Sequence, residues 1–360
     1  MLPCDTVFRQ ADKMKTRRDV LRIIPTAVVA GTARASAQPD FTRIDTHIHI
    51  HRDAPALLSA IKAARWRGLD IVVCPASGGE AFDLEEKLRA TAKVSRDSGG
   101  TLAWASTFDA RGFEDRDFTE RTIARLRQSF ADGAIGVKIW KNIGMSIKGK
   151  SRAYLLPEDA SLRPVYEAIL KAEKTLVAHL AEPDGAWLPL DAKNPELRYY
   201  SANPQWHLYG KSGAPVKEDI LKARDRVLAM YPKLRVVGCH LGSDEDDLGR
   251  LAKRLDAYPN FAVDTAARVR YFARGDREAV RQFLTHYQDR VLYATDFSFR
   301  EGEPAAAGRS LQIVHDRDWA FFSGGDSMEY DGKPTRGLGL PDAVLQKLIR
   351  ENALRWLPGI

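Results

Sequence analysis

The stretch Arg43-Ile-Asp-Thr-His-Ile-His-Ile50 decides the predicted fold of this chain of 360 residues. It belongs to a run of apolar and β-branched residues, 42–50, that is typical of a buried strand. Side chains two positions apart on a strand share a face, so His47 and His49 point the same way. Two imidazoles on one face can bind one cation. An H-x-H pair alone is a weak signal, because two surface histidines give the same pattern.

Short apolar runs and amphipathic stretches alternate through the rest of the chain. The pattern predicts an α/β fold, a (β/α)8 TIM barrel, in which buried parallel strands are each followed by a helix. The predicted catalytic domain is a single unit, 38–360, with long insertions after strands 4, 5 and 8 at 141–157, 181–216 and 297–340. Further strands are predicted at 70–75, 101–107, 134–140, 175–180, 234–241, 260–265 and 290–296. Helices are predicted at 54–66, 80–95, 117–131, 159–173, 217–231, 245–257, 276–287 and 341–356.

The first 37 residues have the order of a signal peptide. Arg17 and Arg18 precede a moderately apolar run, 23–31, and the small residues Ala35-Ser-Ala37 follow it. This order predicts a twin-arginine-type signal peptide at 1–37, the twin-arginine export machinery as a partner, and a periplasmic or secreted location. The apolar run is too short for a permanent membrane span. A disordered basic tail is the alternative interpretation.

Composition narrows the classes of function. With 44% hydrophobic and 29% charged residues, the chain is ordinary for a globular protein. Its net charge is +7, but residues 1–37 hold seven basic and three acidic side chains, so the remainder carries only +3. We therefore expect no nucleic-acid partner. Cys4, Cys74 and Cys239 form no C-x-x-C pair, and the last two lie in strand-like runs as buried thiols.

Other chemistry-bearing residues also fall at the ends of predicted strands. His179 follows Thr-Leu-Val-Ala, His240 follows Val-Val-Gly-Cys, and Asp296 follows Leu-Tyr-Ala-Thr. Any one of them alone is more simply a core residue satisfied by hydrogen bonds. The carboxyl ends of barrel strands meet at one rim, however, so these side chains are expected to gather with His47 and His49. A buried carboxylate such as Asp296 is costly unless it is paired or bound to a metal.

This set resembles the amidohydrolase superfamily of metal-dependent hydrolases. The likeness lies in the H-x-H pair, the strand-end histidines and Asp296, and it spans the chain after residue 37. Within the superfamily the chain looks most like the branch of aminocarboxymuconate-semialdehyde decarboxylase and related amidohydrolases. The segments 44–49 and 238–242 and the ending Glu351-Asn-Ala-Leu-Arg-Trp356 carry that closer likeness.

The resemblance implies roles at matching positions. His47, His49, His179 and Asp296 would bind a divalent metal ion, with zinc expected and manganese as the alternative, which activates a water molecule. Asp296 would accept that water's proton and pass it to the leaving group. His240 would bind a second metal or polarise the substrate and orient the water.

Lys138, in the fourth predicted strand, decides between one and two metal ions per chain. In two-metal members of the superfamily a lysine near this position is carbamylated and bridges both ions, which would make Lys138 a ligand. The simpler interpretation is an ion pair with a carboxylate, or a contact with an anionic substrate.

Five residues are candidates for contacts with a small-molecule substrate. The loop Asn203-Pro-Gln-Trp-His207 resembles a substrate-facing insertion of related barrels, although His207 fits a solvated loop equally well. Lys141 and Arg268 could hold a carboxylate. The full set is Trp140, Lys141, Trp206, His207 and Arg268.

Three functions fit these observations. The favoured one is hydrolysis of an amide, lactone or ester of a small carboxylated substrate by metal-activated water. The second is a lyase, a decarboxylase or hydratase acting on an unsaturated or aromatic carboxylic acid with the same ligands. The third is a non-catalytic periplasmic binding protein, against which the intact ligand set argues. The sequence leaves a homo-oligomer open.

Overall fold

The computed structural model describes residues 39–75 and 82–360. The predicted signal peptide and the start of the predicted helix 80–95 lie outside the described residues. No helix in the described ranges has both the length and the apolar character needed to cross a bilayer.

Parallel strands form one sheet in the order β8-β7-β6-β5-β4-β3-β2-β1-β9. β8 pairs with β7 and β9 pairs with β1, so these two short strands are pieces of one interrupted strand. The backbone N–H of Thr46 donates to Tyr293 O at 3.0 Å, and that of Asp296 donates to His47 O at 2.9 Å. These bonds close the barrel between its first and last strands, which confirms the predicted (β/α)8 architecture. The strands are β1 Arg43–His49, β2 Trp66–Ile71, β3 Leu102–Thr107, β4 Gly136–Ile139, β5 Thr175–Ala178, β6 Val236–Gly238, β7 Phe261–Asp264, β8 Val291–Leu292 and β9 Phe297–Ser298.

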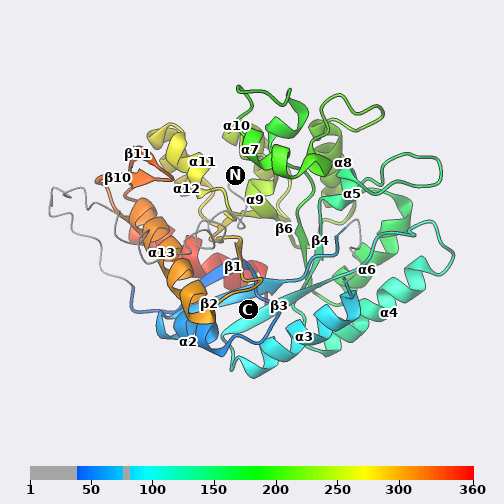
Figure 1. The fold of residues 1–360 in the computed structure, drawn as a ribbon, viewed down its shortest axis with the longest axis horizontal. Coiled ribbons are helices and arrows are strands. Elements are labelled where there is room, and N and C mark those ends of the chain that lie inside the picture. The colour runs from blue at the N-terminus through cyan, green and yellow to red at the C-terminus, as the bar shows by residue number, and fades with distance from the viewer. Residues whose placement is uncertain (1–38, 76–81) are drawn as a thin grey trace, which may run out of the picture.

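Helices surround the sheet, as Figure 1 shows for α2, α3, α4, α6 and α13. The outer helices are α2 Pro55–Ala63, α3 Leu84–Asp97, α4 Phe118–Ala131, α6 Arg163–Lys171, α8 Lys217–Met230, α10 Leu248–Ala257, α12 Arg277–His286 and α13 Pro304–Ser323. Shorter helical segments are α5 Asn142–Met145, η2 Ala160–Leu162, η3 Asp184–Trp187, α7 Leu197–Ala202, η4 Pro204–Trp206, α9 Cys239–Gly242 and α11 Val269–Arg274. The chain ends with α14 Asp342–Gln346, η5 Lys347–Glu351 and α15 Asn352–Trp356.

The second strand begins earlier than predicted. The sequence suggested a helix over 54–66 and a strand from residue 70, but α2 ends at Ala63 and β2 starts at Trp66. Arg65 has a left-handed φ of 55°, which stops the helix before the indole. Trp66 then packs against Tyr293, with ring centroids 5.3 Å apart. Contacts distant in sequence therefore decide this boundary.

The predicted insertion 297–340 contains ordered secondary structure that the sequence analysis missed. Pro304 starts the 20-residue helix α13, which packs against α2. At Gly308 a Cβ atom would lie 2.8 Å from Ala60 Cβ, so this glycine allows the close approach of the two helices. An antiparallel hairpin follows, with strands β10 Ser327–Tyr330 and β11 Lys333–Arg336. Helix α13 thus completes the outer layer after the last barrel strand.

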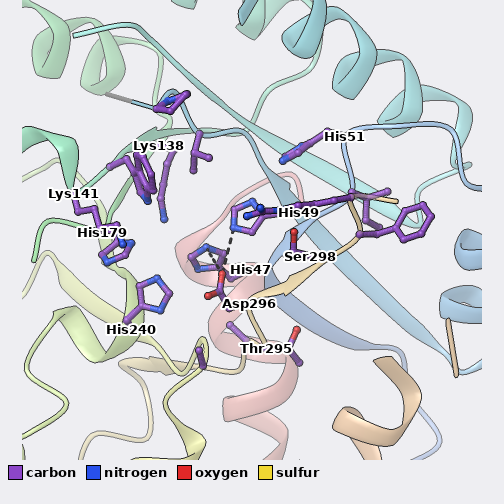
Figure 2. A pocket seen from close by; sticks show the side chains of 18 of the residues that line it. His47, His49, His51, Lys138, Lys141, His179, His240, Thr295, Asp296 and Ser298 are labelled. Carbon is purple, nitrogen blue, oxygen red and sulfur yellow. Dashed lines mark ion pairs between the residues drawn. The ribbon is translucent and has the colours of Figure 1, made fainter. Parts of the chain in front are cut away.

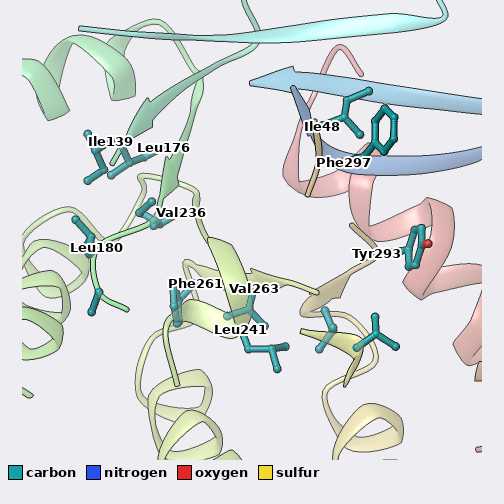
Figure 3. Close-up of a cluster of buried hydrophobic side chains, with 14 of the residues drawn as sticks. Ile48, Ile139, Leu176, Leu180, Val236, Leu241, Phe261, Val263, Tyr293 and Phe297 are labelled. Carbon is teal, nitrogen blue, oxygen red and sulfur yellow. The ribbon is translucent and has the colours of Figure 1, made fainter. Parts of the chain in front are cut away.

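Most of the core lies between the strands and the surrounding helices, and Figure 3 shows part of this cluster. A second cluster fills the barrel interior and includes the end of the chain. There the interior side chains of Ile44, Ile71 and Val237 pack with Trp356 and Ile360 from the C-terminus. The C-terminal segment therefore closes one end of the barrel, and the other end remains for a site.

We expect Trp356→Ala to lower the free energy of unfolding by about 3–5 kcal/mol, because it leaves a cavity under the barrel. The matched control is Leu354→Ala two residues away, where a 43% exposed side chain predicts a change of less than about 0.5 kcal/mol. Urea unfolding followed by circular dichroism measures both. Equal effects of the two substitutions would contradict the closure of the barrel by Trp356.

Candidate active site

A cavity of about 1590 Å³ contains the residues that the sequence analysis gathered. Figure 2 shows them pointing into it from the ends of different strands. The lining includes all six predicted metal-binding or catalytic side chains, namely His47, His49, Lys138, His179, His240 and Asp296.

Three of these side chains converge most closely. Asp296 Oδ1 lies 3.5 Å from His47 Nε2 and 3.3 Å from His49 Nε2. One ligand atom of each residue lies within 4.8 Å of those of the other two, a spacing suited to one metal ion. His179 and His240 are outside this triplet but adjoin it. The ring centroids of His47 and His240 are 5.1 Å apart, and those of His240 and His179 are 4.1 Å apart.

Hydrogen bonds fix which nitrogen of each imidazole faces the site. His47 Nδ1 is 2.9 Å from Asp264 Oδ2, and His49 Nδ1 is 2.6 Å from Ile71 O. A carboxylate and a carbonyl oxygen only accept, so both Nδ1 atoms carry a proton. The neutral rings then present Nε2 lone pairs toward Asp296. Such support of a ligand's second nitrogen is usual in metal sites.

With both rings neutral, the lone pairs of His47 Nε2, His49 Nε2 and Asp296 Oδ1 face one another. This arrangement needs a positive charge, either an extra proton on an imidazole or a bound cation. The donor set of two imidazoles and a carboxylate fits a divalent transition metal. The buried Nε2 of His179, which has no hydrogen-bond partner among the described residues, is a further available donor atom.

The protonation preferences of the site agree with this charge requirement. Burial raises the pKa of Asp296, but His49, His47 and the ammonium of Lys138 outweigh it and lower that pKa to about 2. Burial and the charge of Lys138 lower the pKa of His47, whereas Cys239 and Asp264 raise it above its usual value overall. The cluster thus attracts positive charge while Asp296 stays ionised.

His179 and His240 are held as neutral imidazoles. Burial, the largest cause, lowers both pKa values well below the usual range, and neighbouring cations lower them further. His240 Nδ1 lies 2.9 Å from Ala266 O and carries the proton, so its Nε2 is an acceptor. Neutral rings are the form in which histidine binds metal ions.

A left-handed backbone conformation at two strand ends sets the direction of the side chains of His240 and Asp296. The sequence predicted unbroken strands over 234–241 and 290–296, but β6 ends at Gly238 and β8 at Leu292. His240 has φ 58° and Asp296 has φ 64°, values rare for residues other than glycine. A local conformation of this kind leaves no mark in hydrophobic periodicity. The left-handed conformation turns each side chain toward the barrel axis, whereas the side chains of an unbroken strand would have continued to alternate between its two faces.

Lys138 is buried in the barrel interior. Its Nζ donates a hydrogen bond to Cys239 Sγ at 2.8 Å, which joins β4 to the residue after β6. Cys239 also belongs to a second, fully buried group of potential metal ligands with His47 and Asp264. The predicted alternative of an ion pair with a carboxylate is not the contact seen for Lys138, since its hydrogen-bond partner is a thiol.

One wall of the cavity is aromatic and contains a buried ion pair. The rings of Trp140 and Trp206 meet edge to face with centroids 5.0 Å apart. Lys141 Nζ lies 4.4 Å from the Trp206 ring centroid, pairs with Glu182, and donates to Tyr199 OH at 2.9 Å. Trp140, Lys141 and Trp206 therefore line the cavity as predicted, but Glu182 already neutralises the charge of Lys141.

Two predicted substrate contacts lie elsewhere. Among the described residues, His207 and Arg268 do not line this cavity. His207 Nε2 is 2.8 Å from Leu188 O, within its own loop. Arg268 is fully buried with its Nε 3.6 Å from Glu245 Oε1. These side chains serve local structure, because partners close in space occupy them.

The structure adds residues that the sequence analysis overlooked. Asp264 ends β7 and accepts hydrogen bonds from His47 and, at 2.7 Å, from the backbone N–H of His240. A carboxylate after the apolar run Phe-Ala-Val carries the same signal that singled out Asp296, so it could have been found. His51 lines the cavity past the end of β1, with Nδ1 2.9 Å from Asp70 Oδ1. Glu182 gave no comparable signal.

Comparisons with known proteins agree with this geometry. No curated protein sequence matches the chain. Among solved structures, 2,6-dihydroxybenzoate decarboxylase in complex with 2,6-dihydroxybenzoate superposes with a TM-score of 0.51 and 16% identity, over 88% of this chain and 99% of that one. A 5-carboxyvanillate decarboxylase from Novosphingobium aromaticivorans, complexed with manganese and a nitrobenzoic acid, gives a TM-score of 0.50 and 14% identity, over 88% and 96%. At these identities the likeness concerns the fold.

A family model covers nearly the whole barrel. It matches residues 44–359, from the second residue of β1 to the penultimate residue of the chain, and describes amidohydrolases. The match spans every strand that contributes to the cavity. The chain therefore belongs to the amidohydrolase family.

Proposed function

We propose that this protein is a metal-dependent hydrolase that cleaves an amide, lactone or ester of a small carboxylated substrate. The observation that carries the proposal is the convergence of His47 Nε2, His49 Nε2 and Asp296 Oδ1 on one point of the cavity. His179 is the fourth proposed ligand. Zinc is the expected ion, and the manganese complex of a structural relative supports manganese as the alternative.

A divalent cation at this point would supply a Lewis acid that makes water nucleophilic near neutral pH. Asp296, ionised because its pKa is low, accepts the proton of the attacking water and returns it to the leaving group. His240 presents an unprotonated Nε2, so it accepts a hydrogen bond and orients the water. In this tautomer His240 Nε2 does not donate a hydrogen bond to a substrate carbonyl. Of the roles that the resemblance implies for His240, polarising the substrate therefore does not fit.

Positively charged side chains on the cavity wall are the reason for proposing a carboxylated substrate. Lys141 is occupied by Glu182, and Arg270 lies 2.8 Å from Glu196. Arg52 and Lys87 line the same cavity. We propose that this second group holds the substrate's carboxylate. Trp140 and Trp206, packed edge to face, supply an aromatic wall in the same cavity.

A lyase is the second candidate. It is supported by two structural relatives that share the fold with this chain, both of which are named as decarboxylases. The same metal ligands serve hydrolysis and decarboxylation, so the product of the reaction distinguishes the two functions. Export also remains a proposal: residues 1–37 would direct the protein through the twin-arginine route to the periplasm or the exterior.

Metal binding gives the first test. We expect His49→Ala to lower the affinity for zinc and manganese by at least about 100-fold while the fold is retained, because one of three converging donors is lost. His286→Ala, which alters an exposed histidine, is the matched control and should leave the affinity unchanged. Equilibrium dialysis followed by elemental analysis measures both. Wild-type affinity in His49→Ala would refute the ligand set.

The state of Lys138 gives the second test. Its amine donates a hydrogen bond to Cys239, so we expect one cation per chain and an unmodified lysine. Elemental analysis of metal-saturated protein gives the stoichiometry, and intact mass spectrometry detects bound carbon dioxide. Two ions per chain with a carbamylated Lys138 would overturn the one-metal site.

The reaction type gives the third test. A panel of small carboxylated lactones, amides and esters, together with hydroxybenzoic acids, is incubated with enzyme in water enriched in oxygen-18. Hydrolysis places the heavy oxygen in a new acid product. Release of carbon dioxide without incorporation into the organic product would instead establish the lyase.

A further inference from the structure

Asp45 is a buried carboxylate behind the proposed metal site. It is 2% exposed and lies two residues before His47 on β1. Its Oδ1 accepts hydrogen bonds from the backbone N–H groups of His47, at 3.2 Å, and Thr295, at 3.0 Å. Its Oδ2 accepts from Thr295 Oγ1 at 2.6 Å. One side chain thus ties the first strand to the residue before Asp296.

The fourth hydrogen-bond donor to Asp45 comes from outside the barrel. His315, on α13, places Nε2 3.1 Å from Asp45 Oδ2 and is 2% exposed. A carboxylate only accepts, so His315 Nε2 carries the proton and donates. The imidazole is stacked on Trp66 with ring centroids 3.9 Å apart, which fixes its orientation. Helix α13 therefore contributes to the rear of the site.

The segment that Asp45 holds is the break between β8 and β9. Asp296 sits there at φ 64°, a conformation that costs free energy for a residue with a side chain. Thr295 Oγ1 also accepts from the backbone N–H of Phe297 at 3.1 Å, so this hydroxyl joins both sides of the break. Figure 2 shows Thr295 directly beside Asp296. Hydrogen bonds on either side of Asp296 hold the left-handed turn in place.

We propose that Asp45, Thr295 and His315 form a positioning cluster that sets the separation of His47 and Asp296 for cation binding. The inference rests on the proposed function. They are positioning residues, because none of them belongs to the converging triplet of potential ligands. A carboxylate that accepts four hydrogen bonds across two strands fixes geometry in the way that supporting partners do around metal ligands.

Thr295 offers a matched pair of variants. Thr295→Val keeps the shape of the side chain but removes the hydroxyl that donates to Asp45, whereas Thr295→Ser retains it. We expect Thr295→Val to weaken manganese and zinc binding by about 10–100-fold. Thr295→Ser should stay within about threefold of the wild type. Competition with a chromogenic chelator gives the affinities, and the visible absorption of cobalt(II)-loaded protein reports the coordination geometry.

His315→Phe keeps a ring against Trp66 and removes the donor, so it provides an independent second variant. We expect weaker metal binding and a changed cobalt spectrum for His315→Phe, and recovery of part of the affinity in His315→Gln. Unfolding midpoints of the metal-free proteins separate positioning from a loss of fold. If Thr295→Val and Thr295→Ser lose stability and affinity equally, or if Thr295→Val and His315→Phe bind metal like the wild type, the positioning cluster is refuted. A wild-type protein that binds no metal would instead refute the proposed function itself.

Discussion

Three electron-pair donors face one another at the carboxyl ends of the barrel strands, and this repulsive arrangement governs the rest of the site. The Nδ1 atoms of His47 and His49 are tied to Asp264 and to the carbonyl of Ile71, so their Nε2 lone pairs point at the Asp296 carboxylate. A partly buried cluster of this kind is stabilised by a positive charge in its centre. The closure of the barrel brings the donors together, because the interrupted last strand joins β1 on one side and β7 on the other.

The sequence was sufficient for the fold class and for the members of the cluster. Apolar runs ending in His or Asp predict strand ends, and parallel barrel strands share one rim, so His47, His49, His179, His240 and Asp296 were found without coordinates. The sequence could not supply the left-handed turns at His240 and Asp296, because hydrogen bonds from distant residues stabilise them. Helix α13 was missed because its sequence is only weakly amphipathic. Arg268 does not line the cavity because it is buried beside Glu245, a contact that the sequence alone does not show.

Charges inside the barrel are largely neutralised by one another. Lys141 is paired with Glu182, and Arg268 lies beside Glu245. Burying an ion without a partner is costly, so a cation deep in a barrel is more often balanced by the protein than reserved for a ligand. An anionic substrate would be attracted by Arg52 and Lys87, which line the cavity.

The central claim is that a single cation lies between His47, His49 and Asp296. A crystal of the protein grown with manganese and measured for anomalous scattering tests it most directly. We expect one strong anomalous peak about 2.0–2.2 Å from His47 Nε2, His49 Nε2 and Asp296 Oδ1. A peak at the buried His47–Cys239–Asp264 group, or no peak in this cavity, would contradict it.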